Sequence, residues 1–382
     1  MKLDWKSNDS SRSKIISGGL MQISSAGSQL LVGTDWLSRA TLLRRVDPTG
    51  MFIIDQFEVH DETGEAVILE EETMGGGGVY AMTAARMFLP PSKCALVVDQ
   101  GQDFPLDFKD QLMSMGEDMF WFRECQGAST RALNMYSGRR IGDGHQSFKY
   151  LSRQAQIQLQ DLVCAPSPFV NTLPDYIHLV CLLDRASAVC DELEHLRRKF
   201  PHLASWEPKI IWEPLGQACV HANLDKVASI ASQFAVFSPN VLEIQSLLSI
   251  PQIVSPEAVE SAAREFGNLI PDTTVIVRAG PLGSFTVSKT WSGWVPAYWK
   301  PKEQDRVIDP TGGGNAWLGG LCAGLLLSKG DIKLGCFFGS AAASFAIEQR
   351  GLPHLDKGYW NSDDPWRRLR EVAARMDILT RT

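Results

Sequence analysis

The stretch IDPTGGGNAWLGG, residues 308–320, holds the residues whose types and spacing are best suited to chemistry. Three glycines, Gly312 to Gly314, lead directly into an apolar run that predicts a helix. Glycine lets backbone N–H groups approach an anion, and the positive end of a helix dipole favours negative charge there. The pattern therefore predicts a loop that binds an oxyanion such as phosphate. A tight turn that only packs a helix against a sheet is the alternative.

Asn315 follows the glycines at the position where such a loop would place an acid or a base. A side-chain amide does not take up a proton at neutral pH, although it orients a hydroxyl group by hydrogen bonding. The residue therefore leaves two interpretations open, a loop that catalyses and a loop that only holds a ligand.

Further candidate residues lie in a second glycine cluster and after apolar runs. Gly75 to Gly78 precede VYAMTAARMF, which predicts another loop that opens a helix. Ligands of parallel sheets bind beyond the carboxyl ends of the strands. The polar residues expected at such ends are Asp55, Asp99, Glu213, Asn240, and Arg278 with Gly280. Asn240 with Glu243, in SPNVLE, also fits a capping box that only begins a helix.

The elements that must position these residues alternate between strands and helices. From residue 175 onward, helical segments separate four apolar runs, namely YIHLVCLL, KIIW, FAVFSPN and TTVIVRAG. This order predicts an α/β fold with a mostly parallel sheet and helices on both faces. Asp364 followed by Pro365 predicts the start of a final helix. Residues 1–48 are rich in serine and are expected to form a flexible extension before a single domain over 49–382.

Composition narrows the classes of function. The chain has 382 residues and a formal net charge of -7, which disfavours electrostatic binding to a nucleic acid. The apolar run Ala316–Leu327 is too short to span a membrane. We expect a cytoplasmic protein with free thiols, and basic residues near the N-terminus leave mitochondrial import as the alternative.

The two glycine segments together resemble the two signatures of the ribokinase/PfkB carbohydrate-kinase family. DPTGGGN resembles its D-T-x-G-A-G-D signature, and Gly75–Gly78 followed by Ala84–Met87 resembles its G-G-x-G-x-N signature and the helix after it. The resemblance covers residues 50–355 and follows most closely a fungal branch with asparagine in place of the catalytic aspartate. It implies a ribokinase-like three-layer αβα sandwich with a mostly parallel central sheet. A small β lid is expected from segments near 56–73 and 127–150.

The resemblance also implies a function, cofactors and partners. Members of the family transfer a phosphoryl group from ATP to a hydroxyl of a sugar, nucleoside or related metabolite, with Mg²⁺ and in some cases K⁺. The partner is then a small-molecule substrate, with no nucleic acid and no membrane, and a homodimer through the lid is expected from some members. The residues carried over as catalytic are Gly312, Gly313, Gly314 and Asn315. Those for the substrate are Asp55, Gly75, Gly76 and Tyr80. Those for nucleotide and magnesium are Asn240, Glu243, Arg278, Gly280 and Gly283, and those for a monovalent cation are Asp309 and Thr311.

Two residues depart from the family pattern. Tyr80 stands where the family has an asparagine that contacts the sugar, and Asn315 stands where it has the aspartate that acts as general base. General base catalysis contributes about 10²- to 10⁴-fold. Phosphoryl transfer relies mainly on positioning and electrostatic stabilisation, so turnover without that base is expected to persist. A ligand-binding pseudokinase with a regulatory role is the second hypothesis.

Two further patterns keep other interpretations open. Gly76, Gly78 and Ala81 fit the dinucleotide pattern G-x-G-x-x-A, with Asp99 at a suitable distance, although EETM is expected to separate these glycines from their strand. The aromatic segment TWSGWVPAYW, residues 290–299, is expected to be a β-hairpin that buries its rings, with stacking on a base or a substrate as the alternative.

Overall fold

The fold is taken from a computed structural model, which describes residues 21–22, 31–32, 45–48, 50–60, 66–137, 147–152 and 157–379. The chain divides into two compact units, Met1–Leu43 and Arg44–Thr382. The described part of the first unit is an antiparallel pair of strands, β1 (Met21–Gln22) and β2 (Leu31–Val32). The remainder of the extension expected over residues 1–48 lies outside the described residues, except for its last residues, which belong to the second unit.

A seven-stranded sheet forms the centre of the second unit, in the order β15-β14-β13-β12-β11-β10-β3. Its strands are β3 (Arg45–Pro48), β10 (Pro174–Cys181), β11 (Lys209–Pro214), β12 (Val236–Phe237), β13 (Thr274–Arg278), β14 (Ser284–Val287) and β15 (Ser292–Val295). The strands from β3 to β13 pair in parallel, and β14 and β15 are antiparallel. The predicted mostly parallel sheet is confirmed, and it begins at β3, before the domain boundary expected at residue 49.

A parallel pair of strands extends this arrangement beyond β3. The pair consists of β6 (Leu96–Gln100) and β7 (Phe120–Glu124), and a single parallel bridge joins Val46 of β3 to Cys94. Two helices of this region are α3 (Leu106–Met115) and α4 (Leu159–Val163).

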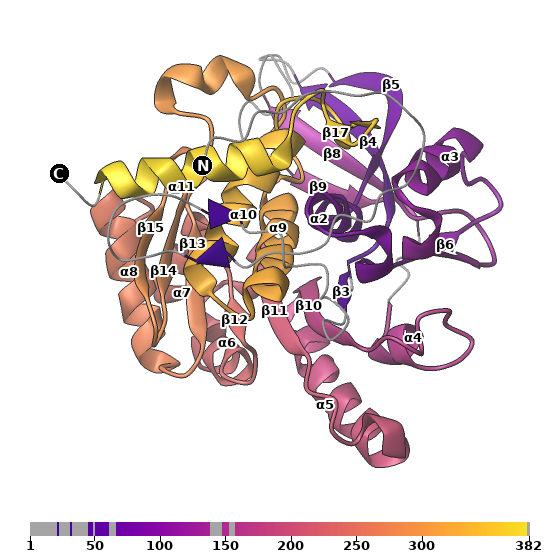
Figure 1. Ribbon diagram of the computed structural model, residues 1–382, viewed down its shortest axis with the longest axis horizontal. Helices are drawn as coiled ribbons and strands as arrows, with labels where there is room; N and C mark the ends of the chain where they lie inside the picture. The colour runs from indigo at the N-terminus through magenta and orange to yellow at the C-terminus, as the bar shows by residue number, and fades with distance from the viewer. Residues whose placement is uncertain are drawn as a thin grey trace. The chain divides into compact units, whose positions relative to one another are not determined.

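Helices cover both faces of the central sheet, so the three-layer αβα sandwich is confirmed (Figure 1). On one face pack α2 (Gly77–Arg86), α9 (Gly313–Ser328) and α10 (Ile332–Ala346), with α11 (Pro365–Leu379) outside α10. On the other face lie α5 (Leu183–Lys199), α6 (Leu224–Ala231), α7 (Val241–Leu248) and α8 (Pro256–Leu269).

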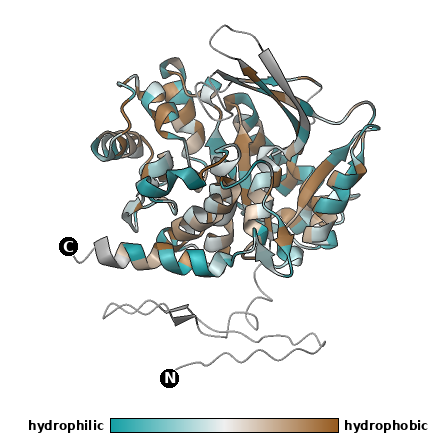
Figure 2. Cartoon of the chain, turned by 90° about the horizontal axis from the view of Figure 1, so that it is seen from above, coloured by the Kyte–Doolittle hydropathy of each residue, from teal (hydrophilic) through white to brown (hydrophobic). Residues whose placement is uncertain are grey.

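The core follows from the apolar strands and two apolar helices. Parallel strands are covered on both faces and therefore read as continuous apolar runs, such as the IIW of β11. Figure 2 shows hydrophobic residues gathered on the central strands between the helices. α9 and α10 are apolar on all sides because α2, α11 and the sheet surround them. None of the helices within the described ranges combines the length and hydrophobicity that crossing a membrane requires.

A second sheet of four strands lies beside α2, in the order β5-β4-β8-β9 (Figure 1). Its strands are β4 (Ile53–His60), β5 (Ala66–Gly75), β8 (Arg131–Ser137) and β9 (Ser147–Tyr150). The segments expected to supply the lid contribute to this sheet. β5 runs through Gly75, so the expectation that EETM separates a strand from the glycines was wrong: pairing with β4 keeps these residues extended. The last hairpin joins β16 (Leu355–Asp356) to β17 (Tyr359–Trp360).

Candidate functional site

The loop before α9 has the geometry of an anion-binding helix start. Gly312 has φ 73°, and α9 begins at Gly313, as the sequence predicted. The N–H of Gly313 donates to the carbonyl of Pro310 at 3.0 Å, and the helix ladder begins where Ala316 N–H donates to Gly312 at 2.8 Å. The N–H groups of Gly314 and Asn315 precede that ladder, so they have no partner within the helix. They form the positive end of α9.

The ring of Tyr80 packs against Gly312 and leaves no room for a side chain at this position. A Cβ atom added to Gly312 would overlap the Tyr80 ring, and the positive φ itself disfavours any other residue. The ring is buried, and its packing against this loop is the structural role that the sequence left open beside a role in the substrate pocket.

We expect Gly312→Ala to lower the free energy of unfolding by about 1–3 kcal/mol more than Gly280→Ala. Both glycines have positive φ, but a Cβ on Gly280 meets nothing within 4 Å, so the difference isolates the contact with Tyr80. Urea unfolding of the two variants measures it. Equal losses in both variants would show that the ring moves aside without cost.

A cavity of about 340 Å³ lies against the start of α9. Its walls include the loop before α9, which we call the anion loop (Gly312–Gly314), the end of β13 and the segment after β15. Eight of the residues that the sequence singled out line it, namely Asn240, Arg278, Gly280, Gly283, Tyr298, Trp299, Gly313 and Gly314. The structure thus brings four of the five predicted nucleotide residues to one cavity beside two of the predicted catalytic glycines, while Glu243 is not part of its lining.

The aromatic segment, residues 290–299, lies partly in a β-hairpin and partly in the wall of the cavity. Trp294 lies on β15 and packs, partly buried, against Phe285 with ring centroids 5.3 Å apart. The expected hairpin is therefore formed with β14, and the segment supplies only its second strand. Tyr298 and Trp299 lie beyond the hairpin and line the cavity. The guanidinium of Arg368 lies 5.0 Å from each of these two ring centroids.

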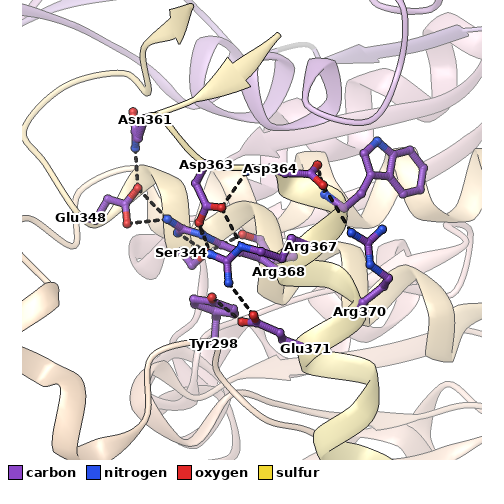
Figure 3. Close-up of polar contacts among 12 residues, drawn as sticks. Tyr298, Ser344, Glu348, Asn361, Asp363, Asp364, Arg367, Arg368, Arg370 and Glu371 are labelled. Atoms are coloured by element: carbon purple, nitrogen blue, oxygen red, sulfur yellow. Dashed lines mark hydrogen bonds and ion pairs between the residues drawn. The ribbon is translucent and has the colours of Figure 1, made fainter. Parts of the chain in front are cut away.

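Arg368, on α11, makes polar contacts with several residues next to this wall of the cavity (Figure 3). Its side chain is 4% exposed and donates to Ser344 Oγ at 2.9 Å, and Ser344 also lines the cavity. Carboxylate oxygens of Glu348 and Asp363 lie 2.9 and 2.8 Å away. The predicted helix start is confirmed, because Asp364 accepts from Trp366 N–H at 2.9 Å. Nothing in the sequence singled out Arg368, since its partners come from α10, the turn after it and the segment before α11.

Four buried or partly buried side chains meet behind the anion loop. Glu213, at the end of β11, accepts from Asn315 Nδ2 at 2.7 Å and lies 3.0 Å from His178 Nε2. Arg278 Nη2 lies 2.9 Å from the other carboxylate oxygen of Glu213. Burial opposes ionisation of Glu213, but Arg278, His178 and Asn315 outweigh it and lower its pKa. The sequence placed Glu213 at a strand end, and it gave no sign of His178.

Asn240 and Glu243 form the capping box that the sequence offered as one interpretation. Glu243 N–H donates to Asn240 Oδ1 at 2.9 Å, and Asn240 N–H donates to Glu243 Oε2 at 2.7 Å. Burial raises the pKa of Glu243 to about 7, against the opposing charge of Arg278. The box begins α7 and also places Asn240 in the cavity wall.

Asp55 lies on the other side of the anion loop, on β4. It is 4% exposed and accepts a hydrogen bond from Asn134 Nδ2 at 3.0 Å. Its carboxylate occupies the space where a Cβ on Gly75 would stand. Burial raises the pKa of Asp55 to about 7, and the nearby charge of Asp309 adds to this effect. A carboxylate is suited to accepting hydrogen bonds from hydroxyl groups.

The loop itself joins the two sheets. Asp309 is buried and accepts from Thr311 N–H at 2.9 Å, while the Thr311 hydroxyl lies 2.7 Å from the hydroxyl of Tyr136 on β8. The side chain of Asn315 lies close to Gly77 at the start of α2. Asp99, by contrast, is held in an ion pair by Arg123 at 2.5 Å, which argues against the dinucleotide interpretation.

Comparisons with known proteins agree with this geometry. A family model described as pfkB family carbohydrate kinase matches residues 208–355. Protein MAK32 of Saccharomyces cerevisiae is 30% identical over 322 residues, which cover 80% of this chain and 85% of that protein. An uncharacterized protein of Schizosaccharomyces pombe is 30% identical over 355 residues, which cover 85% of this chain and 91% of that protein.

Solved structures share the fold. Phosphofructokinase-2 from Escherichia coli matches with a TM-score of 0.59 and 16% identity, covering 87% of this chain and 100% of that one. Ribokinase from Giardia lamblia matches with a TM-score of 0.60 and 17% identity, covering 87% and 99%. Together with the glycine loop and the cavity beside it, these similarities show that the chain belongs to the pfkB family of carbohydrate kinases and has the ribokinase-like fold.

Proposed function

We propose that the chain transfers the γ-phosphoryl group of ATP to a hydroxyl group of a small molecule such as a sugar or a nucleoside. The observation that carries this proposal is the start of α9, whose outward N–H groups and glycines border a cavity lined by Arg278. The Nε–H of Arg278 is buried and has no hydrogen-bond partner within the described part of the chain. A buried donor without a partner is costly, and phosphate oxygens would satisfy it.

The cavity residues suit the donor side of this reaction. Tyr298 and Trp299 offer aromatic faces to a base, and Gly280 and Gly283 let the backbone come close to it. Phosphate groups would then lie toward Gly313 and Gly314, where the α9 dipole and N–H groups stabilise negative charge.

The residues also fit a magnesium ion carried by the nucleotide. Mg²⁺ is commonly held by one or two carboxylates together with phosphate oxygens. Glu243 Oε2 serves the capping box, and Glu243 and Asn240 are the groups that we propose to face the ion directly or through water. The ion would neutralise charge on the phosphates. Arg278, whose Nη2 lies 4.0 Å from Glu243, supplies a second positive charge.

The acceptor side is proposed around Asp55, Gly75 and Gly76. The Asp55 carboxylate accepts hydrogen bonds from substrate hydroxyl groups, and Tyr80 closes the pocket beside the anion loop. Asp309 and Thr311 are proposed for a monovalent cation, and a potassium complex of phosphofructokinase-2 from Escherichia coli has the same fold. The four-stranded sheet would act as the lid over this side.

Asn315 supports a second candidate, a fungal pseudokinase that binds nucleotide without turnover and has a regulatory role. Its amide cannot accept the proton of the attacking hydroxyl. A purified protein that binds ATP but consumes none with any of a broad panel of alcohols supports this candidate and rejects the kinase. Acceptor-dependent formation of ADP rejects the pseudokinase.

We expect Gly314→Ala to weaken ATP binding by roughly 10- to 100-fold. The added Cβ would overlap the Arg278 guanidinium and push it away from the phosphates, whereas alanine itself favours the helix. Gly216→Ala is the control, because a Cβ there meets nothing within 4 Å. Calorimetric titration with ATP and Mg²⁺ measures both, and an unchanged affinity in Gly314→Ala would contradict the assignment of the phosphate site.

A further inference from the structure

The proposed reaction needs a group that takes the proton of the acceptor hydroxyl, and Asn315 cannot. The carboxylate in direct contact with Asn315 is that of Glu213, whose Oε2 lies 2.7 Å from Asn315 Nδ2. A Cβ on Gly314 would stand 3.4 Å from Glu213 Oε1. Glu213 therefore lies at the start of α9, where the transferred group would be held.

The surroundings of Glu213 keep it ionised and fixed. The residue is 8% exposed, and its two oxygens face Arg278 on β13, His178 on β10 and Asn315 on α9. A carboxylate has about four positions for hydrogen-bond donors, so these three contacts leave one position for a hydroxyl group. Glu243 is the other carboxylate near Arg278, and its Oε2 is already held by the backbone of Asn240.

The contact with Glu213 also orients the amide of Asn315. Because one N–H of Nδ2 donates to Glu213, the second N–H is left to donate to the oxygen of the acceptor hydroxyl, whose own hydrogen then faces the carboxylate. The two side chains together thus offer one carboxylate and one amide at the start of α9. This is one negative charge at a place where two would repel each other strongly.

We propose that Glu213 is the catalytic carboxylate of this site, with Asn315 as the partner that orients the hydroxyl group. This inference rests on the proposed function. The hydroxyl O–H bond breaks and its proton goes to Glu213, while the oxygen forms a bond to the γ-phosphorus of ATP. The bond between the γ-phosphorus and the bridging oxygen breaks, and ADP leaves with that electron pair. Glu213 then releases the proton to solvent after the phosphorylated product departs.

This assignment predicts that turnover requires one carboxylate in the Glu213–Asn315 pair, at either of the two positions. Two carboxylates or two amides are each expected to lower kcat. Glu213→Gln leaves two amides, and Asn315→Asp leaves two carboxylates within hydrogen-bond distance. The double variant Glu213→Gln with Asn315→Asp exchanges the two groups and restores one charge. A purely structural ion pair with Arg278 does not require the exchanged pair to regain turnover.

The experiment compares kcat and ATP affinity of the full-length wild type, both single variants and the double variant. Each single variant is expected to lose roughly 100-fold or more in kcat with ATP affinity within about threefold, and the double variant to return within about tenfold of the wild type. The control is Glu192→Gln, which removes a carboxylate paired with Arg185 at 2.5 Å on α5 and is expected to keep full kcat.

The outcomes separate this inference from the proposed function. An active wild type with an equally active Glu213→Gln variant overturns the role of Glu213 and leaves the kinase assignment standing. A double variant no better than the single variants also overturns it. A wild type that binds ATP and phosphorylates no acceptor overturns both. Thermal unfolding of the four proteins identifies any single variant that fails to fold, and the double variant then decides alone.

Discussion

Arg368→Met is expected to lower the free energy of unfolding by about 3–5 kcal/mol, since removing one member of a buried ion pair leaves the carboxylate of Glu348 without its cation. Arg368 is 4% exposed and holds Glu348 and Asp363 together with Ser344 (Figure 3). Methionine fills a similar volume but supplies no donor. The loss is also expected to loosen the cavity wall at Tyr298. Urea unfolding at neutral pH measures the first effect, and titration with ATP measures the second.

Arg370→Met is the matched control on the same helix. Its guanidinium lies 3.4 Å from Asp364, and the two side chains are 48% and 38% exposed. An exposed pair of this kind contributes about 0–1 kcal/mol. A loss in Arg368→Met no larger than that in Arg370→Met would contradict the role of Arg368 in holding α11 to α10.

The contribution of this cluster to the stability of the folded chain depends on pH. Burial raises the pKa of Asp363, but hydrogen bonds from Arg367 and Arg368 outweigh it and lower the pKa to about 2. A carboxyl group whose pKa is lower in the folded chain stabilises it above pH 4, and that contribution disappears as pH falls from about 4 to 2. Arg368→Met should therefore lose less stability than the wild type over this range.

Asp55→Asn is expected to stabilise the chain at pH 8 by up to about 4 kcal/mol while it impairs binding of the acceptor. The pKa of Asp55 is about 7 in the folded chain and 3.8 in its ordinary state. As pH rises from about 4 to 7, the unfolded chain loses this proton first, so the folded state loses stability. Asparagine has no charge to bury and keeps an oxygen for Asn134.

Urea unfolding of wild type and Asp55→Asn between pH 4 and pH 8 tests this prediction. The difference in the free energy of unfolding should be near zero at pH 4 and grow through pH 7. Asp107→Asn, at an exposed carboxylate on α3, should change the free energy by less than about 0.5 kcal/mol at every pH. A difference for Asp55→Asn that is the same at every pH would show that Asp55 does not bear a buried charge.

The fold and the start of α9 at the Gly312–Gly314 loop could be predicted from sequence because their signals are local. The apolar runs that form β10 and β11 have the length and pattern of buried parallel strands. Gly312 to Gly314 lie directly at the start of α9, so these few residues predict where the helix begins. The capping box joins Asn240 and Glu243, which are only three positions apart, so it too could be predicted.

The contacts that decide the chemistry are not local. Glu213 and Asn315 are 102 positions apart, and their hydrogen bond exists only because β11 ends beside the start of α9. The strand-end rule placed Glu213 near a ligand but gave no reason to pair it with the amide. The burial of Arg368 could not be predicted for a similar reason, because a charged residue is buried only where tertiary partners compensate its charge. The boundary at residue 49 missed β3, whose four residues pair in parallel with β10 far along the chain.

The most direct test of the proposed function follows the γ-phosphate itself. The purified full-length chain is incubated with Mg²⁺, ATP labelled in the γ-phosphoryl group, and each of a panel of sugars, nucleosides and other small alcohols. We predict that the label appears in a phosphomonoester with at least one acceptor and that Gly314→Ala forms far less of it. Label that remains in ATP or inorganic phosphate with every acceptor, while the chain binds ATP, would contradict phosphoryl transfer at the Gly312–Gly314 loop.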